Sequence, residues 1–155
     1  MKTKKHLPIL LIILLFLVGC GGGGDDSHPS ASCDPMKRGD GLTPEITFTQ
    51  VPTFNTTENL IGMVWNVSPK NYGLAILINV GGLWWSKPTD VAPVTLIACN
   101  CSFEGDVTTG GSDHLATRII AYLIPITYKP PVALGAKDIP PDIIKNAITF
   151  KEAVR

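Results

Sequence analysis

The stretch Tyr72-Gly73-Leu74-Ala75-Ile76-Leu77-Ile78-Asn79-Val80 decides the fold class of this chain. Every second residue in it is large, and Gly73, Ala75 and Asn79 are among the residues between. A period of two is the period of a β-strand, in which successive side chains point to opposite faces of a sheet. The stretch therefore predicts a β-strand whose large residues share one face.

Other short strands are predicted on both sides of this one. Residues 60–67 alternate in the same way and place Met63 and Trp65 on one face. Further candidates lie around Ile46 and Phe48 and over residues 94–97, 102–107 and 147–151. Turn sequences such as Ser68-Pro69-Lys70-Asn71 and Gly81-Gly82 separate them. Short strands at this spacing are typical of an all-β, antiparallel, Ig-like β-sandwich of about seven or eight strands.

Two later segments need a choice between helix and strand. Residues 114–124 fit a helix with Asp113 as its N-cap, or a strand over residues 117–124. The β-branched residues of this segment and the following Pro125 favour the strand. Residues 140–145 begin with two prolines and predict one short helical turn near the C-terminus, because proline suits the first helical position.

The first 19 residues carry the features of an export signal. Three lysines within the first five residues precede an apolar run over residues 7–18. This run is shorter than the about 20 apolar residues that a membrane-spanning helix needs, and it fits the apolar region of a signal peptide. We therefore assign residues 1–19 to a signal peptide.

The run ends in Leu17-Val18-Gly19-Cys20, which resembles the lipobox of bacterial lipoproteins. The resemblance implies that the Cys20 thiol receives diacylglycerol, that the peptide is cut before Cys20, and that fatty acid such as palmitate acylates the new amine. Two or three acyl chains hold a protein durably on a membrane, whereas one does not. Gly21 in place of an aspartate implies the outer membrane in a host with two membranes, and otherwise the outer face of the cell membrane. The alternatives are an ordinary signal peptide or an anchor helix with a coincidental cysteine.

The rest of the chain divides into a tether and one domain. Residues 20–43 contain the lipidated Cys20 and a stretch rich in Gly, Ser and Asp, which predicts a flexible linker. Residues 44–155 form the predicted β-sandwich domain. The 155 residues have a formal net charge of zero, and this balance argues against nucleic acid as a partner.

Segment 72–131 resembles a family of small β-sandwich modules in secreted bacterial proteins, some of them attached to carbohydrate-active enzymes. The matching features are Tyr72 and its alternating strand, Trp84-Trp85-x-Lys87-Pro88, Phe103, Thr109-Gly110-Gly111-x-Asp113, Ala116-Thr117-x-Ile119, Tyr122-Leu123-Ile124-Pro125 and Tyr128-x-Pro130-Pro131. The resemblance implies a sandwich like that of carbohydrate-binding modules, but it does not specify a ligand. The chain departs from the pattern at Cys99-Asn100-Cys101, where a tight turn with glycine is expected.

Three cysteines remain besides Cys20, an odd number for an oxidising compartment. Cys99 and Cys101 are two residues apart, so a direct bridge between them would be strained unless Asn100 makes a tight turn. We expect a disulfide from Cys33 to either Cys99 or Cys101. Three free thiols and a Cys99–Cys101 bridge are the alternatives, and no metal site is expected because no His or paired Cys motif completes four ligands.

The sequence contains no nucleophile elbow, metal-binding His pair, phosphate loop or Cys-x-x-Cys motif. Glu104, Asp106 and Asp113 are the close-set acids, and we expect them in turns or on solvated strand faces. A glycosidase pair or a calcium site at Asp106 and Asp113 would be the chemical alternative. We therefore predict no enzymatic activity and no cofactor.

Trp84 and Trp85 are the leading candidates for a ligand site. Adjacent residues on a strand face opposite sides, so one indole is expected inside and the other near the surface, close to Lys87. An exposed indole offers a flat apolar platform for a sugar ring, with hydroxyls meeting Lys87 or the nearby Asp90. The alternative is that both indoles serve packing alone.

These features predict a non-catalytic, lipid-anchored envelope protein with a carbohydrate-binding β-sandwich. Its partners would be the membrane, through the lipid, and a polysaccharide. The alternative is a structural lipoprotein that binds an envelope protein and has no small-molecule ligand.

Overall fold

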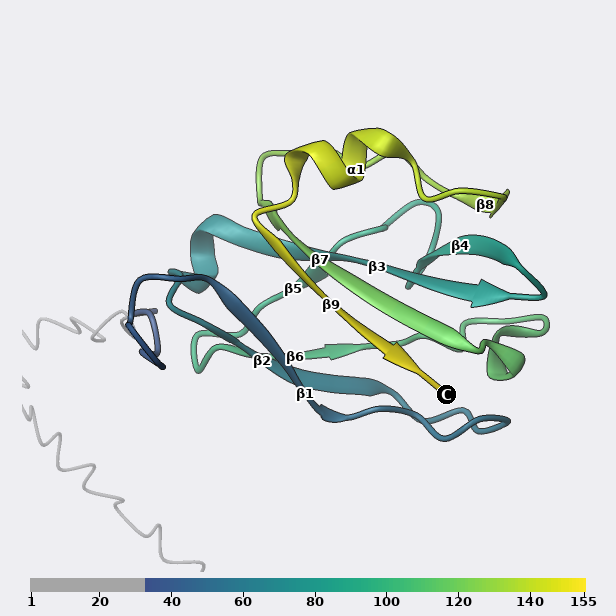
Figure 1. The fold of residues 1–155 in the computed structure, drawn as a ribbon, viewed down its shortest axis with the longest axis horizontal. Coiled ribbons are helices and arrows are strands. Elements are labelled where there is room, and N and C mark those ends of the chain that lie inside the picture. Colours follow the sequence, from purple (N-terminus) through teal and green to yellow (C-terminus); the bar gives the residue numbers. More distant parts are fainter. Residues whose placement is uncertain (1–32) are drawn as a thin grey trace, which may run out of the picture. The chain divides into compact units, whose positions relative to one another are not determined.

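The computed structural model describes residues 33–155. The expected signal peptide, the lipidation residue Cys20 and the first part of the expected linker lie outside the described residues. Within residues 33–155, two antiparallel sheets pack face to face, so the predicted all-β sandwich is confirmed (Figure 1). No helix in this part of the chain has the length and apolar character required to cross a membrane.

The smaller sheet has three strands in the order β1-β2-β6. They are β1 (Glu45–Gln50), β2 (Leu60–Trp65) and β6 (Ser102–Gly105). Strand β2 alternates strictly between buried and half-buried residues, as predicted for residues 60–67. The face that carries Met63 and Trp65 is the half-buried one, and Leu60, Gly62 and Val64 are buried.

The larger sheet has six strands. Five follow the order β8-β4-β3-β7-β9, and β5 pairs with one end of β3. They are β3 (Tyr72–Val80), β4 (Leu83–Lys87), β5 (Thr95–Leu96), β7 (Arg118–Pro125), β8 (Leu134–Ala136) and β9 (Thr149–Val154). The central strand β3 is thus the stretch that decided the fold class from the sequence.

The nine strands of the described residues exceed the predicted seven or eight. The strands predicted from alternation in the sequence do not include β4 and β8, for different reasons. In β4 the three consecutive large residues Leu83, Trp84 and Trp85 hide the alternation, and β8 has only three residues, with Gly135 in the left-handed region at φ 77°. Neither strand has a strong period-2 signal of its own.

The ambiguous segments are resolved as predicted. Residues 118–125 form strand β7, preceded by the short 3₁₀ turn η2 (Asp113–Leu115). The helical turn α1 (Pro141–Asn146) lies where the prolines predict it. A second 3₁₀ turn, η1 (Pro69–Asn71), leads into β3.

Strand β3 is buried on both faces, which the alternation alone did not reveal. Its residues Leu74, Ile76 and Ile78 enter the inner cluster between the two sheets. The inner cluster also contains Ile46, Leu60, Val64, Phe103, Ile119, Ala121 and Leu123. The opposite face enters an outer cluster made of Ala75, Leu77, Trp84, Ile120, Tyr122, Ile124, Ala133 and Ile143.

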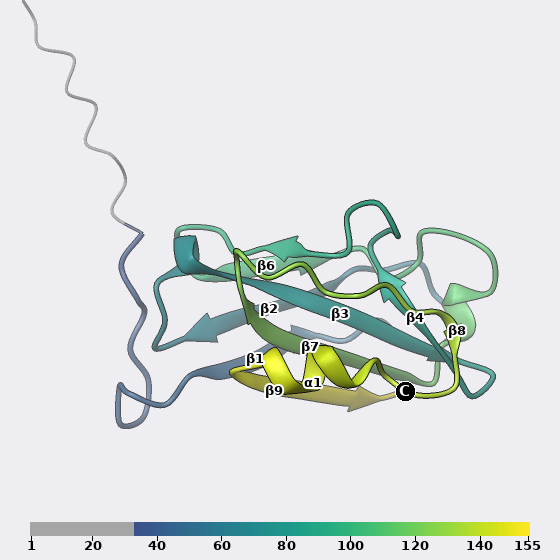
Figure 2. The same cartoon turned by 90° about the horizontal axis from the view of Figure 1, so that it is seen from above.

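The outer cluster exists because the segment between β7 and β9 folds back over the larger sheet. Figures 1 and 2 show α1 on the face of this sheet that points away from the smaller sheet. Ile143 of α1 is 1% exposed and supplies the apolar contact. The molecule therefore has three layers, and a strand with apolar residues on both sides is what such a central position requires.

Residues 33–43, which the sequence analysis assigned to the tether, are joined to the folded unit. The backbone N–H of Asn66 donates to the carbonyl of Met36 at 2.7 Å, and the Asn66 side chain bonds Arg38 and Thr43. A disulfide joins Cys33 to Cys99. The folded unit therefore includes residues before residue 44, and Asn66, directly after β2, bonds the backbone of this segment.

Candidate functional site

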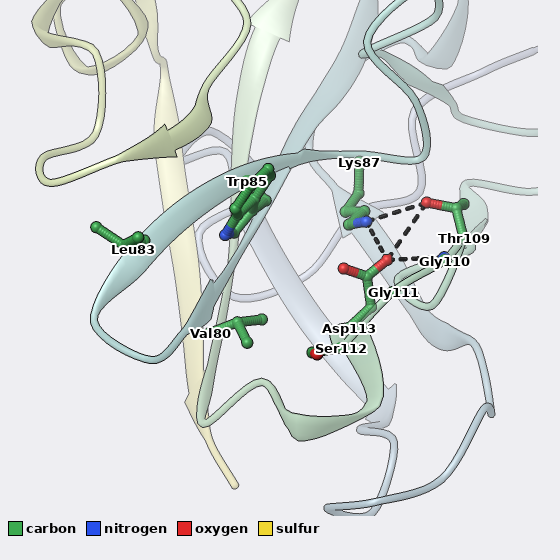
Figure 3. A pocket seen from close by; sticks show the side chains of 9 residues that line it. All are labelled: Val80, Leu83, Trp85, Lys87, Thr109, Gly110, Gly111, Ser112 and Asp113. Carbon is green, nitrogen blue, oxygen red and sulfur yellow. Dashed lines mark hydrogen bonds and ion pairs between the residues drawn. The ribbon is translucent and has the colours of Figure 1, made fainter.

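A pocket of about 540 Å³ opens at one end of the sandwich. Small-molecule sites commonly occupy ~300–1,000 Å³. The pocket lies between the hairpin of β3 and β4 and the loop that leads into η2 (Figure 3). Its lining residues are Val80, Leu83, Trp85, Lys87, Thr109, Gly110, Gly111, Ser112 and Asp113.

Strand β4 supplies one wall of the pocket. Leu83, Trp85 and Lys87 are alternate residues and so share a face of the strand. The tight turn Gly81-Gly82 before them has φ values of 60° and 84°, which glycine adopts without strain. This turn pairs Val80 with Leu83 and brings both to the rim of the pocket.

The two indoles separate as the alternation predicts. Trp84 is 5% exposed and packs in the outer cluster, with the Arg118 guanidinium 5.0 Å from its ring centroid. Trp85 is half-buried, packs against the inner cluster and lines the pocket. Of the two candidates from the sequence, only Trp85 is therefore in position to meet a ligand there.

Gly135 in the neighbouring strand β8 leaves room for the Trp85 indole. A Cβ atom added at Gly135 would lie 3.1 Å from Cζ2 and 3.2 Å from Cη2 of Trp85. These distances are closer than ordinary contact, so a side chain at residue 135 would crowd the ring.

A buried ion pair forms the polar side of the pocket. Lys87 Nζ bonds Asp113 Oδ2, and the two residues are only 6% and 9% exposed. Lys87 Nζ also donates to Thr109 Oγ1 at 3.0 Å, and Asp113 Oδ2 accepts from the Gly110 N–H at 3.0 Å. The pair compensates its own charges and pins the glycine loop to β4, as the dashed lines of Figure 3 show.

Several polar atoms at the pocket keep free bonding capacity. Within residues 33–155, neither Asp113 Oδ1 nor Trp85 Nε1 makes a protein hydrogen bond. In that part of the chain, Thr95 Oγ1 is the one side-chain nitrogen or oxygen that is both fully buried and without a partner. Since Asp113 Oδ1 and Trp85 Nε1 also lack a partner, neither of them is fully buried, and both are reachable from solvent. The exposed Ser112 hydroxyl adds a third group at the rim.

Arg155, directly after β9, fixes the chain around Asp113 from behind. Its guanidinium donates to the carbonyls of Ala116 at 2.9 Å and of Asp113 and His114 at 3.4 Å. It also reaches the carbonyls of Pro52 and Thr53 on the loop between β1 and β2. Burial lowers the pKa of Arg155, which reflects how far this cation is withdrawn from water.

Glu104, Asp106 and Asp113, the three close-set acids of the sequence, have different partners in the structure. Glu104 accepts from Asn59 Nδ2 at 2.6 Å, and Asp106 accepts from the Thr108 N–H at 2.9 Å. Neither lines the pocket, whereas Asp113 does. In the described part of the chain no three His, Cys, Asp or Glu side chains are grouped so that they could hold a metal ion.

The three cysteines among the described residues lie at the start of that part of the chain and beside β6, and none of the three lines the pocket. Cys99 is the partner of Cys33, one of the two pairings expected from the sequence. Cys101 is a free, fully buried thiol, and its Sγ accepts from the Met36 N–H at 3.4 Å. The disulfide and the buried thiol thus attach the same segment, residues 33–36, to the sandwich.

The sequence predicts Trp85 and Lys87 as site residues. It does not predict the ion pair between Lys87 and Asp113, or the hydrogen bond from Arg155 to the Asp113 carbonyl. Lys87 and Asp113 are 26 positions apart, so no local spacing links them. Thr109-Gly110-Gly111-x-Asp113 is predicted as a turn, and its glycine pair followed by an acid is the one sequence feature that indicates a role for Asp113. No feature of the sequence around Arg155 indicates its role at the pocket.

Fold and pocket together define the class: an all-β sandwich protein with a tryptophan-walled, ligand-sized pocket at one end. The chain matches no protein-family model, and it is not significantly similar to any curated protein or solved structure. The resemblances to bacterial lipoproteins and to secreted β-sandwich modules rest on the residues quoted for them.

Proposed function

We propose that this protein is a non-catalytic, lipid-anchored envelope protein that binds carbohydrate in the pocket beside Trp85. The observation that carries the proposal is that a half-buried indole and the free polar atoms of Ser112 and Asp113 line one pocket. A sugar ring has an apolar face and polar edges. The indole can stack on the apolar face, and the free polar atoms can bond the hydroxyls at the edges.

The binding wall consists of packed and hydrogen-bonded groups, which favours affinity. Trp85 packs against the inner cluster, and Asp113 is bonded by Lys87, Gly110 and Arg155. Groups that are already in place lose little conformational entropy when a ligand binds. The pocket can therefore bind a weakly interacting molecule such as a sugar without first having to order its own loop.

The pocket supports binding rather than hydrolysis. Glycoside hydrolysis commonly uses two carboxyl groups about 5 to 9.5 Å apart across the substrate. Asp113 is the one carboxylate among the residues that line the pocket, and its Oδ2 is committed to Lys87 and Gly110. A single carboxylate that is tied to a cation is poorly suited to act as acid or nucleophile.

The lipid anchor is proposed at Cys20, on the strength of the Leu17-Val18-Gly19-Cys20 motif. Figures 1 and 2 show residues 33–43 at the end of the sandwich opposite to β4 and the pocket loop. The pocket therefore lies at the end of the sandwich remote from residues 33–43.

Mass spectrometry of the protein recovered from bacterial membranes tests the anchor. We expect a mature chain that begins at Cys20 and carries diacylglycerol and an amide-linked fatty acid. Cys20→Ala should abolish incorporation of labelled palmitate and release the protein from the membrane fraction. A wild-type chain that begins upstream of residue 20, or that carries no lipid, would contradict the anchor.

A polysaccharide retention assay tests the pocket, using the full chain in a detergent without a sugar headgroup. Wild type should be retained on at least one immobilised glycan, and Trp85→Ala should lose retention while Trp85→Phe keeps part of it. Trp65→Ala is the matched control, because Trp65 is also half-buried but lies on β2, outside the pocket. Equal retention of wild type and Trp85→Ala would overturn the proposal.

A second candidate function is protein binding by the same lipoprotein. Three apolar residues on α1 and around the start of β9 are strongly exposed: Ile144 at 54%, Ile148 at 46% and Phe150 at 59%. Exposed apolar groups of this kind are typical of protein contacts when they form a patch. Loss of a cross-linked envelope protein in an Ile144→Ser/Phe150→Ser variant, with no glycan retained by wild type, would favour this alternative.

A further inference from the structure

We propose that the pocket selects uncharged sugar residues over both acidic sugars and amino sugars. This inference rests on the proposed carbohydrate-binding function and specifies its ligand class. The observation behind it is the buried Lys87–Asp113 ion pair, which places one charge of each sign in the pocket wall. The other lining residues are uncharged.

The ion pair leaves no net charge to attract an ionic ligand. Lys87 Nζ already bonds Asp113 Oδ2 and Thr109 Oγ1, so two of its three N–H donors are occupied. Asp113 Oδ2 bonds Lys87 and the Gly110 N–H. Both side chains are nearly withdrawn from water, so each depends on the other for charge compensation.

A charged ligand would disturb this balance whichever sign it carried. A carboxylate that approaches Lys87 also meets Asp113 Oδ1, and an ammonium that approaches Asp113 also meets Lys87. Either ligand could gain full pairing only by separating the buried ions, which is strongly unfavourable. Like charges brought together in a partly desolvated site also oppose binding.

Hydroxyl groups, in contrast, can use the bonding capacity that the pair leaves open. A sugar hydroxyl can donate to Asp113 Oδ1, and another can accept from Trp85 Nε1. The Ser112 hydroxyl can do either at the rim. The apolar face of a pyranose ring can stack on the Trp85 indole, beside Val80 and Leu83, as Figure 3 shows their side chains to lie.

A glycan array that carries neutral, acidic and amino-sugar oligomers tests this selectivity with the full chain. The array includes three series on the same β-1,4 backbone: cello-oligosaccharides, their uronic acid counterparts and chitosan oligomers. It also includes other neutral hexose and pentose oligomers, oligogalacturonate and alginate oligomers. We expect the best-bound glycan to be neutral and to bind at least about tenfold more tightly than any charged one.

The salt dependence of binding provides an independent measurement on the best ligand. Affinity for an uncharged sugar should change less than about twofold between ~0.05 M and ~0.5 M NaCl, because no free ion pair forms. An affinity that falls steeply with salt, or acidic or amino sugars that bind as well as neutral ones, would overturn the selectivity while leaving carbohydrate binding intact. No retention of any glycan would overturn the proposed function itself.

Charge variants of the pair sharpen the test. Asp113→Asn leaves an uncompensated lysine, so the ratio of acidic to neutral binding should rise at least about fivefold. Lys87→Met leaves an uncompensated carboxylate and should raise the ratio for chitosan oligomers. The double variant Lys87→Met/Asp113→Asn carries no charge in the pocket and should keep the neutral preference. Unchanged ratios in folded single variants, checked by circular dichroism, would contradict the role given to the ion pair.

Discussion

The indole of Trp85 lies against the backbone of Gly135 so closely that a Cβ on residue 135 would come within 3.1 Å of its ring. Strand β4 supplies the aromatic surface of the pocket, and the neighbouring strand β8 leaves room for it at Gly135. The contact makes residue 135, which faces no ligand directly, a determinant of the site.

Substitution of Gly135 is expected to impair binding more than stability. In Gly135→Ala the added methyl group displaces the Trp85 indole, and the left-handed φ of 77° adds roughly 1–2 kcal/mol of backbone strain. Glycan retention should fall, and the tryptophan fluorescence maximum should shift. Gly39→Ala is the matched control, since Gly39 has a φ of 62° but open space around its Cβ. Equal loss of binding in both variants would refute the contact argument.

Breaking the Lys87–Asp113 pair is expected to be costly. Lys87→Met leaves a buried carboxylate without its cation, so the free energy of unfolding should fall by about 3–5 kcal/mol in urea titrations. The double variant Lys87→Met/Asp113→Asn should regain most of this loss. The exposed pair Arg118–Glu152 serves as control, and Glu152→Gln should cost no more than about 1 kcal/mol. A Lys87→Met protein as stable as wild type would contradict the stabilising role given to the pair.

Arg155 is expected to act on the pocket through the backbone of η2. Arg155→Ala removes the donors to the carbonyls of Asp113, His114 and Ala116, so amide hydrogen exchange over residues 113–117 should accelerate. Glycan affinity should fall several-fold because Asp113 is less well fixed. Arg38→Ala removes an arginine that lies over Trp65, away from the pocket, and should leave both measurements unchanged. Unaltered exchange in Arg155→Ala would contradict this role.

The stability of the outer layer is expected to depend on alkaline pH through Tyr128. Burial and a hydrogen bond to Asp142 raise the pKa of Tyr128 from 10.0 to about 12. In the unfolded chain this tyrosine ionises near pH 10, whereas the folded protein keeps its proton up to about pH 12. The resulting stabilisation is therefore complete below pH 10 and is lost as the pH rises to about 12.

Chemical denaturation at several pH values, on wild type and Tyr128→Phe, measures this dependence. The wild type should lose more stability than the variant between pH 10 and pH 12, the two pKa limits. Comparison with the variant removes the contributions of other tyrosines and lysines. Identical pH profiles for the two proteins would exclude a protected proton on Tyr128.

The Cys33–Cys99 disulfide is expected to secure residues 33–43. It spans a sequence separation of 66 residues, and its removal in Cys33→Ser should lower the free energy of unfolding by about 2–4 kcal/mol. Peptide mapping without reduction should recover the Cys33–Cys99 pair. Cys101, which is fully buried, should resist alkylation until the protein unfolds. A mapped Cys33–Cys101 pair would contradict the observed connectivity.

The predictions from the sequence succeeded where a signal is local. The alternation in residues 72–80 identifies the central strand, and Pro140-Pro141 marks the start of α1. The adjacency of Trp84 and Trp85 implied that they would point in opposite directions. Periodicity did not identify β8 or the bounds of β4, because too few residues, or large side chains on both faces, leave no period to detect. A strand at Trp84 and Trp85 was assumed only in the argument about their two faces.

The sequence by itself determined the all-β class and most of its strands, because strand periodicity and turn chemistry are properties of neighbouring residues. The tertiary structure alone decided that Trp85 rather than Trp84 lines the pocket, and that Asp113 and Arg155 complete the site around it. Those choices depend on which face of β4 the outer layer covers and on contacts between residues far apart in the chain. The spacing of neighbouring residues indicates neither the covered face of β4 nor these long-range contacts.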